Sequence, residues 1–456
     1  MTSDFEALRR RFPVLERKTY LNSGSYCALA DTVRDAVNNY MDDRLAVGAN
    51  WDVWITKNES VRALMAQLLG VTSDEIAITA SASAGINALA SALDFSDTRN
   101  KVVVSDFEFP TNAQIWHAQE RRGARVVHVP RAADGYIPLE HFEQMIDDKT
   151  QLVAVTHVCF RNGARLDIPG IVKIAHARGA RVLLDTYQAI GALQVDARAL
   201  GVDFIVGGML KYLLGTAGIG FLYVQDRWIH ELVPTHSGWF AQQDIAAMNI
   251  FGNRPSESAR RFEAGTPAVV NCYAAEAGLK IVLEADPSQI EARVRTLTNY
   301  CLRKLIDIGW SAVTPLDDAR RGPMVAVPAR NTAELFEHLT AADIVTSFRD
   351  NNIRVTCHFY NTLRVSTSAL NVVFEKMDVD GIQHSLRNLC TSGIIEVNEP
   401  PDRAQGWKLA AQRKDWKFRA SFCVSRHNSV PVRPHRAPMS AWVHLTRRPN
   451  RHEPKL

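Results

Sequence analysis

The sequence has no run of about eighteen apolar residues, although 46% of its 456 residues are hydrophobic. A membrane-spanning helix needs such a run, so the sequence excludes one. The first residues, Met1–Arg11, lack the apolar stretch of a secretory signal peptide, and we therefore expect a cytoplasmic protein. The hydrophobic fraction and the 22% of charged residues are those of a globular protein with a large core.

The seven cysteines are odd in number and scattered, and none forms a C-x-x-C pair. This pattern indicates neither a disulfide framework nor a structural zinc site, and we expect no metal. No G-x-G-x-x-G motif follows an early strand pattern. A nucleotide-binding dehydrogenase is therefore disfavoured.

Negative charge is scarce at the C-terminal end. From Pro401 on there are nine Arg and four Lys against two Asp and one Glu, a net charge of +10, whereas the whole chain carries only +4. Residues 1–400 are therefore mildly acidic. The composition of the tail predicts a disordered or loosely docked extension. Basic tails can bind nucleic acid or membranes, but one tail without a fold is a weak signal, and we expect neither partner.

Short apolar segments alternate with helical patterns from about Trp51 to Tyr223. Several are unbroken runs of Val, Ile and Leu, as expected for strands that are buried on both faces. This alternation predicts a mostly parallel seven-stranded sheet with helices on both faces. The predicted strands are Glu75–Thr79, Lys101–Ser105, Arg125–Val129, Leu152–Thr156, Arg181–Asp185, Phe204–Gly207 and Gly220–Val224; the predicted helices are Ser60–Leu69, Asn112–Arg122 and Ile168–Arg178.

Two further segments flank this region. The first twenty residues predict a short amphipathic helix, with Phe5, Leu8 and Phe12 on one side. From about Asn271, a long helical pattern (Ala274–Glu284) precedes mixed helices and short strands, which predicts a smaller α+β domain. We therefore divide the chain into an N-terminal arm (1–20), a large domain (21–270), a small C-terminal domain (271–398) and the basic tail (399–456).

Lys211 lies between a predicted buried strand and a glycine-rich turn. The strand Phe204–Gly207 is followed by Gly208, and the neighbours of the lysine include Leu210 and Tyr212. Apolar surroundings would lower the pKa of Lys211 and free its amine to form a Schiff base. A lysine that reaches the surface beside a turn fits the same residues.

Asp185 ends the predicted strand Arg181–Asp185, where α/β sheets bind their ligands. A carboxylate at this place can keep a pyridine nitrogen protonated, so that the ring acts as an electron sink. Alternatively, Asp185 caps the next helix.

Two other strand ends carry residues that could bind a phosphate or stack on a ring. The small and hydroxylated residues around Ser83 lie between a strand and a helix, where backbone N–H groups and the Ser83 hydroxyl can bind a phosphate. A serine in this segment that only caps the helix is an equal alternative. Phe109, after the next strand, offers a face for stacking on a ring or for packing in the core.

The order of these four segments, with Lys211 following Asp185 by 26 residues, resembles that of pyridoxal 5′-phosphate (PLP) enzymes with the aspartate-aminotransferase-like fold. More narrowly, residues 15–390 resemble the class V aminotransferase family, which includes cysteine desulfurases, kynureninases and isopenicillin N epimerase-like proteins. The matching words are Tyr20–Gly24, Ala82–Asn87, Phe109–Asn112, Asp185 with Gln188, Lys211 with Tyr212 and Gly215, and Ile353–Asn361.

The resemblance implies PLP as cofactor and a role for each matching residue. Lys211 would hold the cofactor as a Schiff base and move the Cα proton. Asp185 would pair with the pyridine nitrogen, Gln188 would reach the ring O3′, and Phe109 would stack on the ring.

The resemblance also implies where the phosphate lies. Ala82, through its backbone, and Ser83 would hold it. Gly208 stands where relatives often carry a phosphate-binding serine, so this contact is open here. Family members are dimers with the active site at the interface, and Thr266 would contact the phosphate of the neighbouring subunit.

For the substrate, the resemblance points to Asn22 and to an arginine that clamps a carboxylate. Arg354 and Arg364 both fit the family's final-strand pattern, in which an Asn follows the arginine by seven residues. We favour Arg354 and keep Arg364 as a rival. The cysteine-bearing loop of the desulfurases is absent, so we expect Cys357 to be a buried structural thiol.

We therefore expect a PLP-dependent lyase, epimerase or aminotransferase that acts on an amino acid or an amino-acid-derived metabolite. The alternative is a non-catalytic family member that serves as a binding or regulatory protein through its basic tail. The Asp185–Lys211 pair argues against this alternative, because a non-catalytic protein has no chemical need to keep it.

Overall fold

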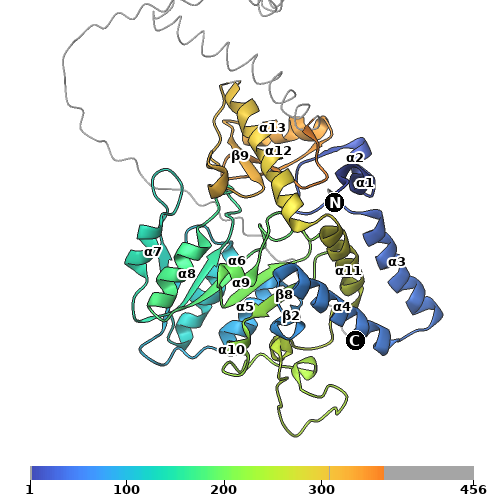
Figure 1. Cartoon of the computed structure of the whole chain (residues 1–456), viewed down its shortest axis with the longest axis vertical. Coiled ribbons are helices and arrows are strands. Elements are labelled where there is room, and N and C mark those ends of the chain that lie inside the picture. Colours follow the sequence, from blue (N-terminus) through green and yellow to red (C-terminus); the bar gives the residue numbers. More distant parts are fainter. Residues whose placement is uncertain (1–2, 308, 364–456) are drawn as a thin grey trace, which may run out of the picture. The chain divides into compact units, whose positions relative to one another are not determined.

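The computed structural model describes residues 3–307 and 309–363 (Figure 1). Its largest element is a seven-stranded sheet with the order β2-β8-β7-β6-β5-β3-β4. β8 runs antiparallel to both of its neighbours, and all the other neighbouring strands are parallel. The predicted mostly parallel sheet is therefore confirmed. The strands are β2 (Ile76–Thr79), β3 (Lys101–Ser105), β4 (Arg125–Val129), β5 (Thr150–Thr156), β6 (Arg181–Asp185), β7 (Phe204–Gly208) and β8 (Gly220–Val224).

The strand bounds lie within two residues of the predicted ones. β3, β4, β6 and β8 agree at both ends, β2 begins one residue later, β5 begins two residues earlier, and β7 ends one residue later. The physical reason is burial: every residue of β2, β3, β7 and β8 is buried, and each of these strands contains at least three consecutive apolar residues that mark it in the sequence.

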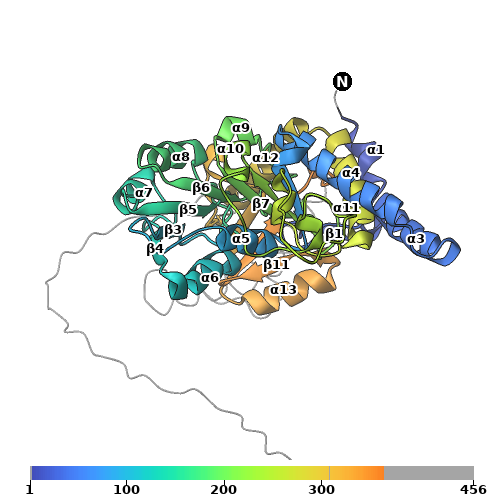
Figure 2. The same cartoon turned by 90° about the horizontal axis from the view of Figure 1, so that it is seen from below.

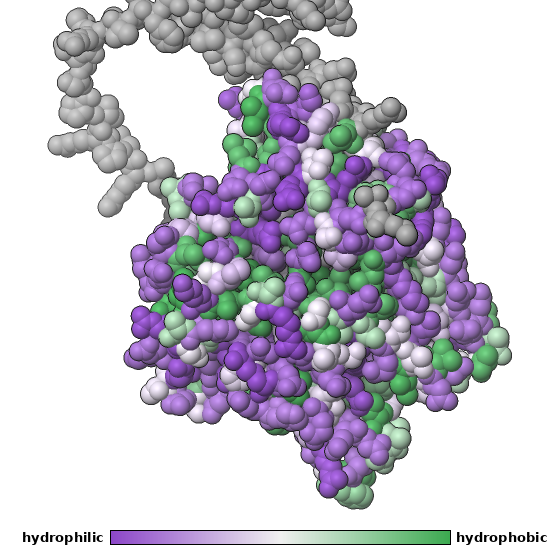
Figure 3. Space-filling view, in the orientation of Figure 1, coloured by the Kyte–Doolittle hydropathy of each residue, from purple (hydrophilic) through white to green (hydrophobic). Residues whose placement is uncertain are grey.

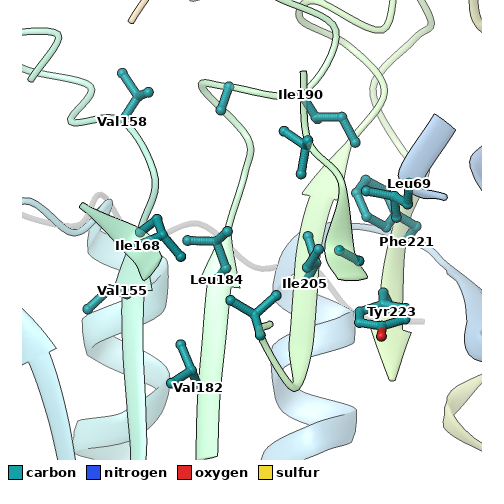
Figure 4. Close-up of a cluster of buried hydrophobic side chains, with 14 of the residues drawn as sticks. Leu69, Val155, Val158, Ile168, Val182, Leu184, Ile190, Ile205, Phe221 and Tyr223 are labelled. Atoms are coloured by element: carbon teal, nitrogen blue, oxygen red, sulfur yellow. The ribbon is translucent and has the colours of Figure 1, made fainter. Parts of the chain in front are cut away.

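Helices cover both faces of the sheet, and alternate residues of each strand point to opposite faces. One face packs against α5 (Ala82–Ser91) and α6 (Pro110–Ala118), and the other against α4 (Trp51–Leu69), α7 (Leu139–Met145) and α8 (Ile168–Ala177). Figure 2 shows α5 and α6 on the opposite side of the sheet from α8. Side chains of the second face appear in Figure 4; they include Val182, Leu184, Ile205, Phe221 and Tyr223 of the sheet with Leu69 and Ile168 of the helices.

Several helices differ from their predicted bounds. α4 begins at Trp51, nine residues before the predicted start at Ser60, because Asn50 caps it and Trp54 and Asn58 continue its buried side. α6 ends at Ala118, and the rest of the predicted helix is the 3-10 helix η2 (Gln119–Arg122). α11 (Val269–Glu284) begins five residues before the predicted Ala274 and packs against α4 and α3 (Asp31–Ala46).

A second, antiparallel sheet has the order β11-β12-β9. Its central strand β12 (Asn352–Thr356) lies between β11 (Ser347–Arg349) and β9 (Met324–Pro328), and the adjoining helices are α12 (Pro287–Asp307) and α13 (Thr332–Ala341). The N-terminal helices α1 (Phe5–Arg9) and α2 (Val14–Arg17) lead into β1 (Thr19–Tyr20), which pairs with β10 (Ile344–Val345).

No helix within residues 3–307 and 309–363 is long and apolar enough to cross a membrane. The basic tail 399–456 and the end of the predicted small domain lie outside the described residues.

Candidate active site

The predicted site segments follow parallel strands that end at one edge of the sheet. β2 leads into α5, β3 into the turn before α6, β6 ends at Asp185, and β7 ends three residues before Lys211. The strand order places β6 and β7 side by side in the sheet. Ligands of α/β sheets bind at the carboxyl ends of the strands, and this edge is therefore the candidate site.

Lys211 lies on the turn after β7, with its amine between two aromatic rings. Its Nζ atom is 4.5 Å from the ring centre of Tyr187 and 5.9 Å from that of Phe109. Removal of the amine from water lowers the pKa of Lys211 to about 8; nearby Asp185 opposes this shift, and Arg354 adds to it. A larger share of the amine is therefore neutral and nucleophilic near pH 7 than in an exposed lysine.

The turn that carries Lys211 is fixed by the core on both sides. Tyr212 and Leu214 are buried, and Leu214 adopts the left-handed conformation with φ of 62°. The Leu214 N–H donates to the Lys211 carbonyl (3.1 Å), and the Gly215 N–H donates to the Met209 carbonyl (2.8 Å). These hydrogen bonds hold the backbone of the turn, and with it the point from which the Lys211 side chain starts.

Asp185 is buried, with 6% of its surface exposed. Its Oδ1 accepts a hydrogen bond from the Tyr187 N–H (2.8 Å). Burial raises the pKa of Asp185, while this hydrogen bond and the charge of Lys211 lower it. The alternative role as a helix cap is not found, because Asp196 caps the next helix, α9 (Ala197–Leu200).

Three buried polar atoms around residue 24 have no hydrogen-bond partner within the described part of the chain: Asn22 Oδ1, Gln188 Oε1 and Tyr212 Oη. Gln188 Nε2 donates to the Gly24 carbonyl (2.9 Å). A Cβ added to Gly24 would lie 2.8 Å from Tyr212 Oη and 3.2 Å from Gln188 Oε1. Buried polar atoms are normally paired, so this cluster fits the polar edge of a bound molecule.

The start of α5 is suited to an anion. Ser81 is the N-cap, because its hydroxyl accepts from the Ala84 N–H (3.1 Å). The alternative of a serine N-cap is therefore found in this segment, at Ser81. Ala82 and Ser83 lie in the first turn, where backbone N–H groups have no partner inside the helix. Gly208, which pairs with Gly220 of β8, lies next to this turn.

Phe109 is held by a buried network that the sequence analysis missed. Glu108, only 7% exposed, accepts from Ser105 Oγ (2.6 Å), the Thr156 N–H (2.9 Å) and Asn112 Nδ2 (2.6 Å). Burial raises the pKa of Glu108 to about 8. The network ties the turn after β3 to the end of β5, while Phe109 itself is exposed and available for stacking. The available signal was an acidic residue, Glu108, in the short turn between β3 and α6.

Arg354 reaches the site from β12. It is 7% exposed; Nη1 donates to the Phe160 carbonyl (2.9 Å), Nη2 donates to Ser347 Oγ (3.0 Å), and Nε has no partner within the described residues. The Phe160 ring packs edge-on against Phe109, with ring centres 5.1 Å apart. Phe160 follows β5 without any sequence signal of its own. The rival Arg364 lies outside the described residues.

Thr266 and Cys357 differ in their exposure. Thr266 is exposed on the segment before α11. Cys357 is fully buried, and burial raises the pKa of its thiol to about 12. This environment fits the expected structural thiol, because nucleophilic cysteines carry a lowered pKa.

Comparison with known proteins agrees with this geometry. The sequence model of a family described as aminotransferase class-V matches residues 29–357. An uncharacterized aminotransferase of Bacillus subtilis, YcbU, is 33% identical over 371 residues, which span 81% of this chain and 98% of that protein. A kynureninase of Deinococcus radiodurans is 32% identical over 307 residues, which span 66% and 73% of the two chains.

Solved structures share the fold. The apo cysteine desulfurase of Thermococcus onnurineus NA1 has a TM-score of 0.75 at 22% identity and covers 83% of this chain and 99% of its own. A variant of the enzyme C-DES, with glycine covalently linked to its PLP cofactor, has a TM-score of 0.73 at 21% identity and covers 80% and 98%. The predicted PLP-dependent transferase fold is confirmed.

Proposed function

The chain belongs to the class V aminotransferase family of PLP-dependent enzymes, and from this premise we propose that it transforms an amino acid or an amino-acid-derived metabolite at Lys211. The observation that carries the proposal is the desolvated Lys211 amine beside the buried carboxylate of Asp185, at the ends of neighbouring strands. When bound, PLP withdraws electrons from the substrate Cα and so weakens its bonds.

The residues around Lys211 have the chemistry to hold PLP. Asp185 offers a buried negative charge for the protonated pyridine nitrogen. Gln188 Oε1 and Tyr212 Oη, which have no hydrogen-bond partner among the residues that the structure describes, offer polar atoms at the ring edge. Phe109 provides an exposed face for stacking, and the N–H groups of Ala82 and Ser83 can donate to the phosphate. Lys211 itself would bind the cofactor as a Schiff base.

Lys211 would also move the proton at the substrate Cα. A group that both accepts and donates a proton works best when its pKa lies close to the working pH. Burial lowers the pKa of Lys211 to about 8, from 10.5. The same desolvation that frees the amine for binding therefore suits it to proton transfer.

Arg354 is the residue that we propose for the substrate carboxylate. Its guanidinium lies close enough to Lys211 to lower the pKa of that lysine, and its Nε atom has no partner in the described part of the chain. A planar guanidinium matches a carboxylate and fixes its orientation. Asn22, whose Oδ1 is also unpartnered there, is the second residue proposed for substrate binding.

We further propose that the enzyme is a homodimer. Large apolar side chains are exposed at the end of α3, where Leu45 is 88% exposed, and in the loop before η4 (Ala259–Phe262), where Phe251 is 94% exposed. Figure 3 shows this loop as a green tip at the lower end of the view. Exposed apolar patches mark contact surfaces, and Thr266, exposed between this loop and α11, would face the partner's site.

A labelling experiment tests the proposal. The protein incubated with PLP should show the visible absorption band of a protonated Schiff base, and borohydride reduction should fix the cofactor on the peptide that contains Lys211. Lys211→Ala should lose both signals, whereas Lys173→Ala, on the exposed side of α8, should keep them. An unlabelled Lys211 peptide would refute the proposal and favour a non-catalytic binding protein.

The reaction type follows from the products. A panel of amino acids incubated with the PLP-loaded enzyme, without borohydride, should give cleavage products such as ammonia and a keto acid for a lyase. An aminotransferase should move the amino group to an added keto acid, and an epimerase should change the optical rotation. The cofactor residues serve all three reactions, so the products alone distinguish them.

A further inference from the structure

We infer that the hydroxyl of Tyr187 donates a hydrogen bond to the phosphate of PLP, at the place where Gly208 has no side chain; this inference rests on the proposed function. Tyr187 follows β6 and lies two residues after Asp185. Its sequence position gives no hint of such a role, because the phosphate contacts of the predicted site all come from other strand ends.

The first observation is the position of the phenol. A Cβ built on Gly208 would overlap the hydroxyl oxygen of Tyr187 and lie 2.6 Å from its ring carbon Cε2. The Tyr187 side chain therefore reaches from the end of β6 across the end of the neighbouring strand β7. It fills the space that any side chain at residue 208 would take.

The second observation places this hydroxyl beside the start of α5. Gly208 pairs directly with Gly220 of β8, and side chains of paired residues point to the same face of a sheet. On that face, a Cβ built on Gly220 would lie 2.8 Å from the backbone nitrogen of Ala82. Because directly paired Cβ positions are about 5 Å apart, the Tyr187 hydroxyl and the first N–H groups of α5 face one small region.

The third observation concerns the chemistry of the phenol. Burial and the charge of Asp185 both raise the pKa of Tyr187, so its hydroxyl keeps its proton. It has no hydrogen-bond partner among residues 3–307 and 309–363. A neutral O–H beside helix N–H groups is a donor for an anion. The ring also flanks the Lys211 amine at 4.5 Å, so the donor belongs to the same site.

The alternative is that Tyr187 only fills space, because its ring also packs against the apolar cluster around α5. Tyr187→Phe separates the two roles, since it removes the hydroxyl and keeps the ring. A hydrogen bond to a charged group contributes enough free energy that its loss should weaken PLP binding about 10- to 100-fold. Pyridoxal, which lacks the phosphate, should bind the variant and the natural protein alike.

The experiment measures the dissociation constants of PLP and pyridoxal by absorbance titration of the full chain. Tyr223→Phe, which removes a buried hydroxyl from β8 away from Gly208, is the matched control and should leave both constants unchanged. Gly208→Ala, which pushes the phenol aside, should weaken PLP binding as Tyr187→Phe does. Thermal unfolding of each variant confirms that it is folded.

The outcomes are distinct. An unchanged dissociation constant for PLP in Tyr187→Phe, or an equal loss for PLP and pyridoxal, would overturn the role of the hydroxyl. Absence of the Schiff-base band in the natural protein would overturn the proposed function, and this inference with it. A loss confined to PLP would support the inference. The double variant Tyr187→Ala, Gly208→Ser should then recover part of the affinity, because serine can place a hydroxyl in the vacated space.

Discussion

Glu263→Ala should lower the free energy of unfolding by about 3 kcal/mol, because it breaks an ion pair that is buried on both sides. The Arg62 and Glu263 side chains are each 4% exposed, and Arg62 Nη1 lies 2.6 Å from Glu263 Oε1. The same oxygen accepts from the N–H of Ile78 on β2 (2.8 Å). Removing the carboxylate leaves a buried guanidinium and a buried N–H without their acceptor.

The magnitude follows from these two losses. Breaking a buried pair by removing one partner costs about 3–5 kcal/mol, and an unsatisfied buried N–H alone costs about 1–3 kcal/mol. Arg62 retains Glu59 as a partner, whose side chain is 47% exposed. We therefore expect the low end of the range, about 3 kcal/mol.

The assay is denaturant unfolding, with Glu284→Ala as the control. Glu284 pairs with Arg11 at the same 2.6 Å, but these side chains are 51% and 33% exposed. Exposed pairs contribute about 0–1 kcal/mol, so the control should change little. Similar losses in Glu263→Ala and Glu284→Ala would refute the reasoning, because burial would then not decide the strength of the pair.

Three further predictions follow from the structure and the sequence. Arg354→Ala should raise the KM for the amino acid at least tenfold without releasing PLP, whereas Cys357→Ala should keep its activity. Steady-state kinetics measure the KM, and absorbance shows whether PLP stays bound. An unchanged KM in Arg354→Ala would refute the role of Arg354 in binding the substrate carboxylate. Burial lowers the pKa of His358 in the folded state to about 4. As the pH falls below about 6.5, His358 therefore takes up a proton in the unfolded state but not in the folded state. This difference should lower the free energy of unfolding by about 2 kcal/mol between pH 6.5 and 5. His358→Gln should reduce this pH dependence in denaturant titrations, and an unchanged slope would contradict the assignment. A chain that ends at Glu399 should bind PLP as the full chain does; loss of binding would show that the tail belongs to the site.

Helical segments without a regular apolar pattern were not predicted. The exposed helix α3 was not predicted, because Val33 is its single buried residue and the sequence shows no apolar stripe. α4 was predicted nine residues too short because the polar Asn58 interrupts the apolar pattern, although the structure buries it. Apolar periodicity reports burial, and it is silent where a helix is exposed or buries a polar side chain.

The sequence by itself determined the strands of the large sheet and the ends of β6 and β7, next to which Asp185 and Lys211 lie. All of β7 is buried, and so is β6 after its first residue, so each strand and its ligand-facing end could be located from local residues alone. Only the tertiary structure decided what surrounds Lys211. Tyr187 reaches across Gly208 because β6 and β7 are neighbours, and Arg354 meets Phe160 although 194 residues separate them. These contacts depend on which strands become neighbours in the sheet, and that order follows from packing between segments that lie far apart in the sequence.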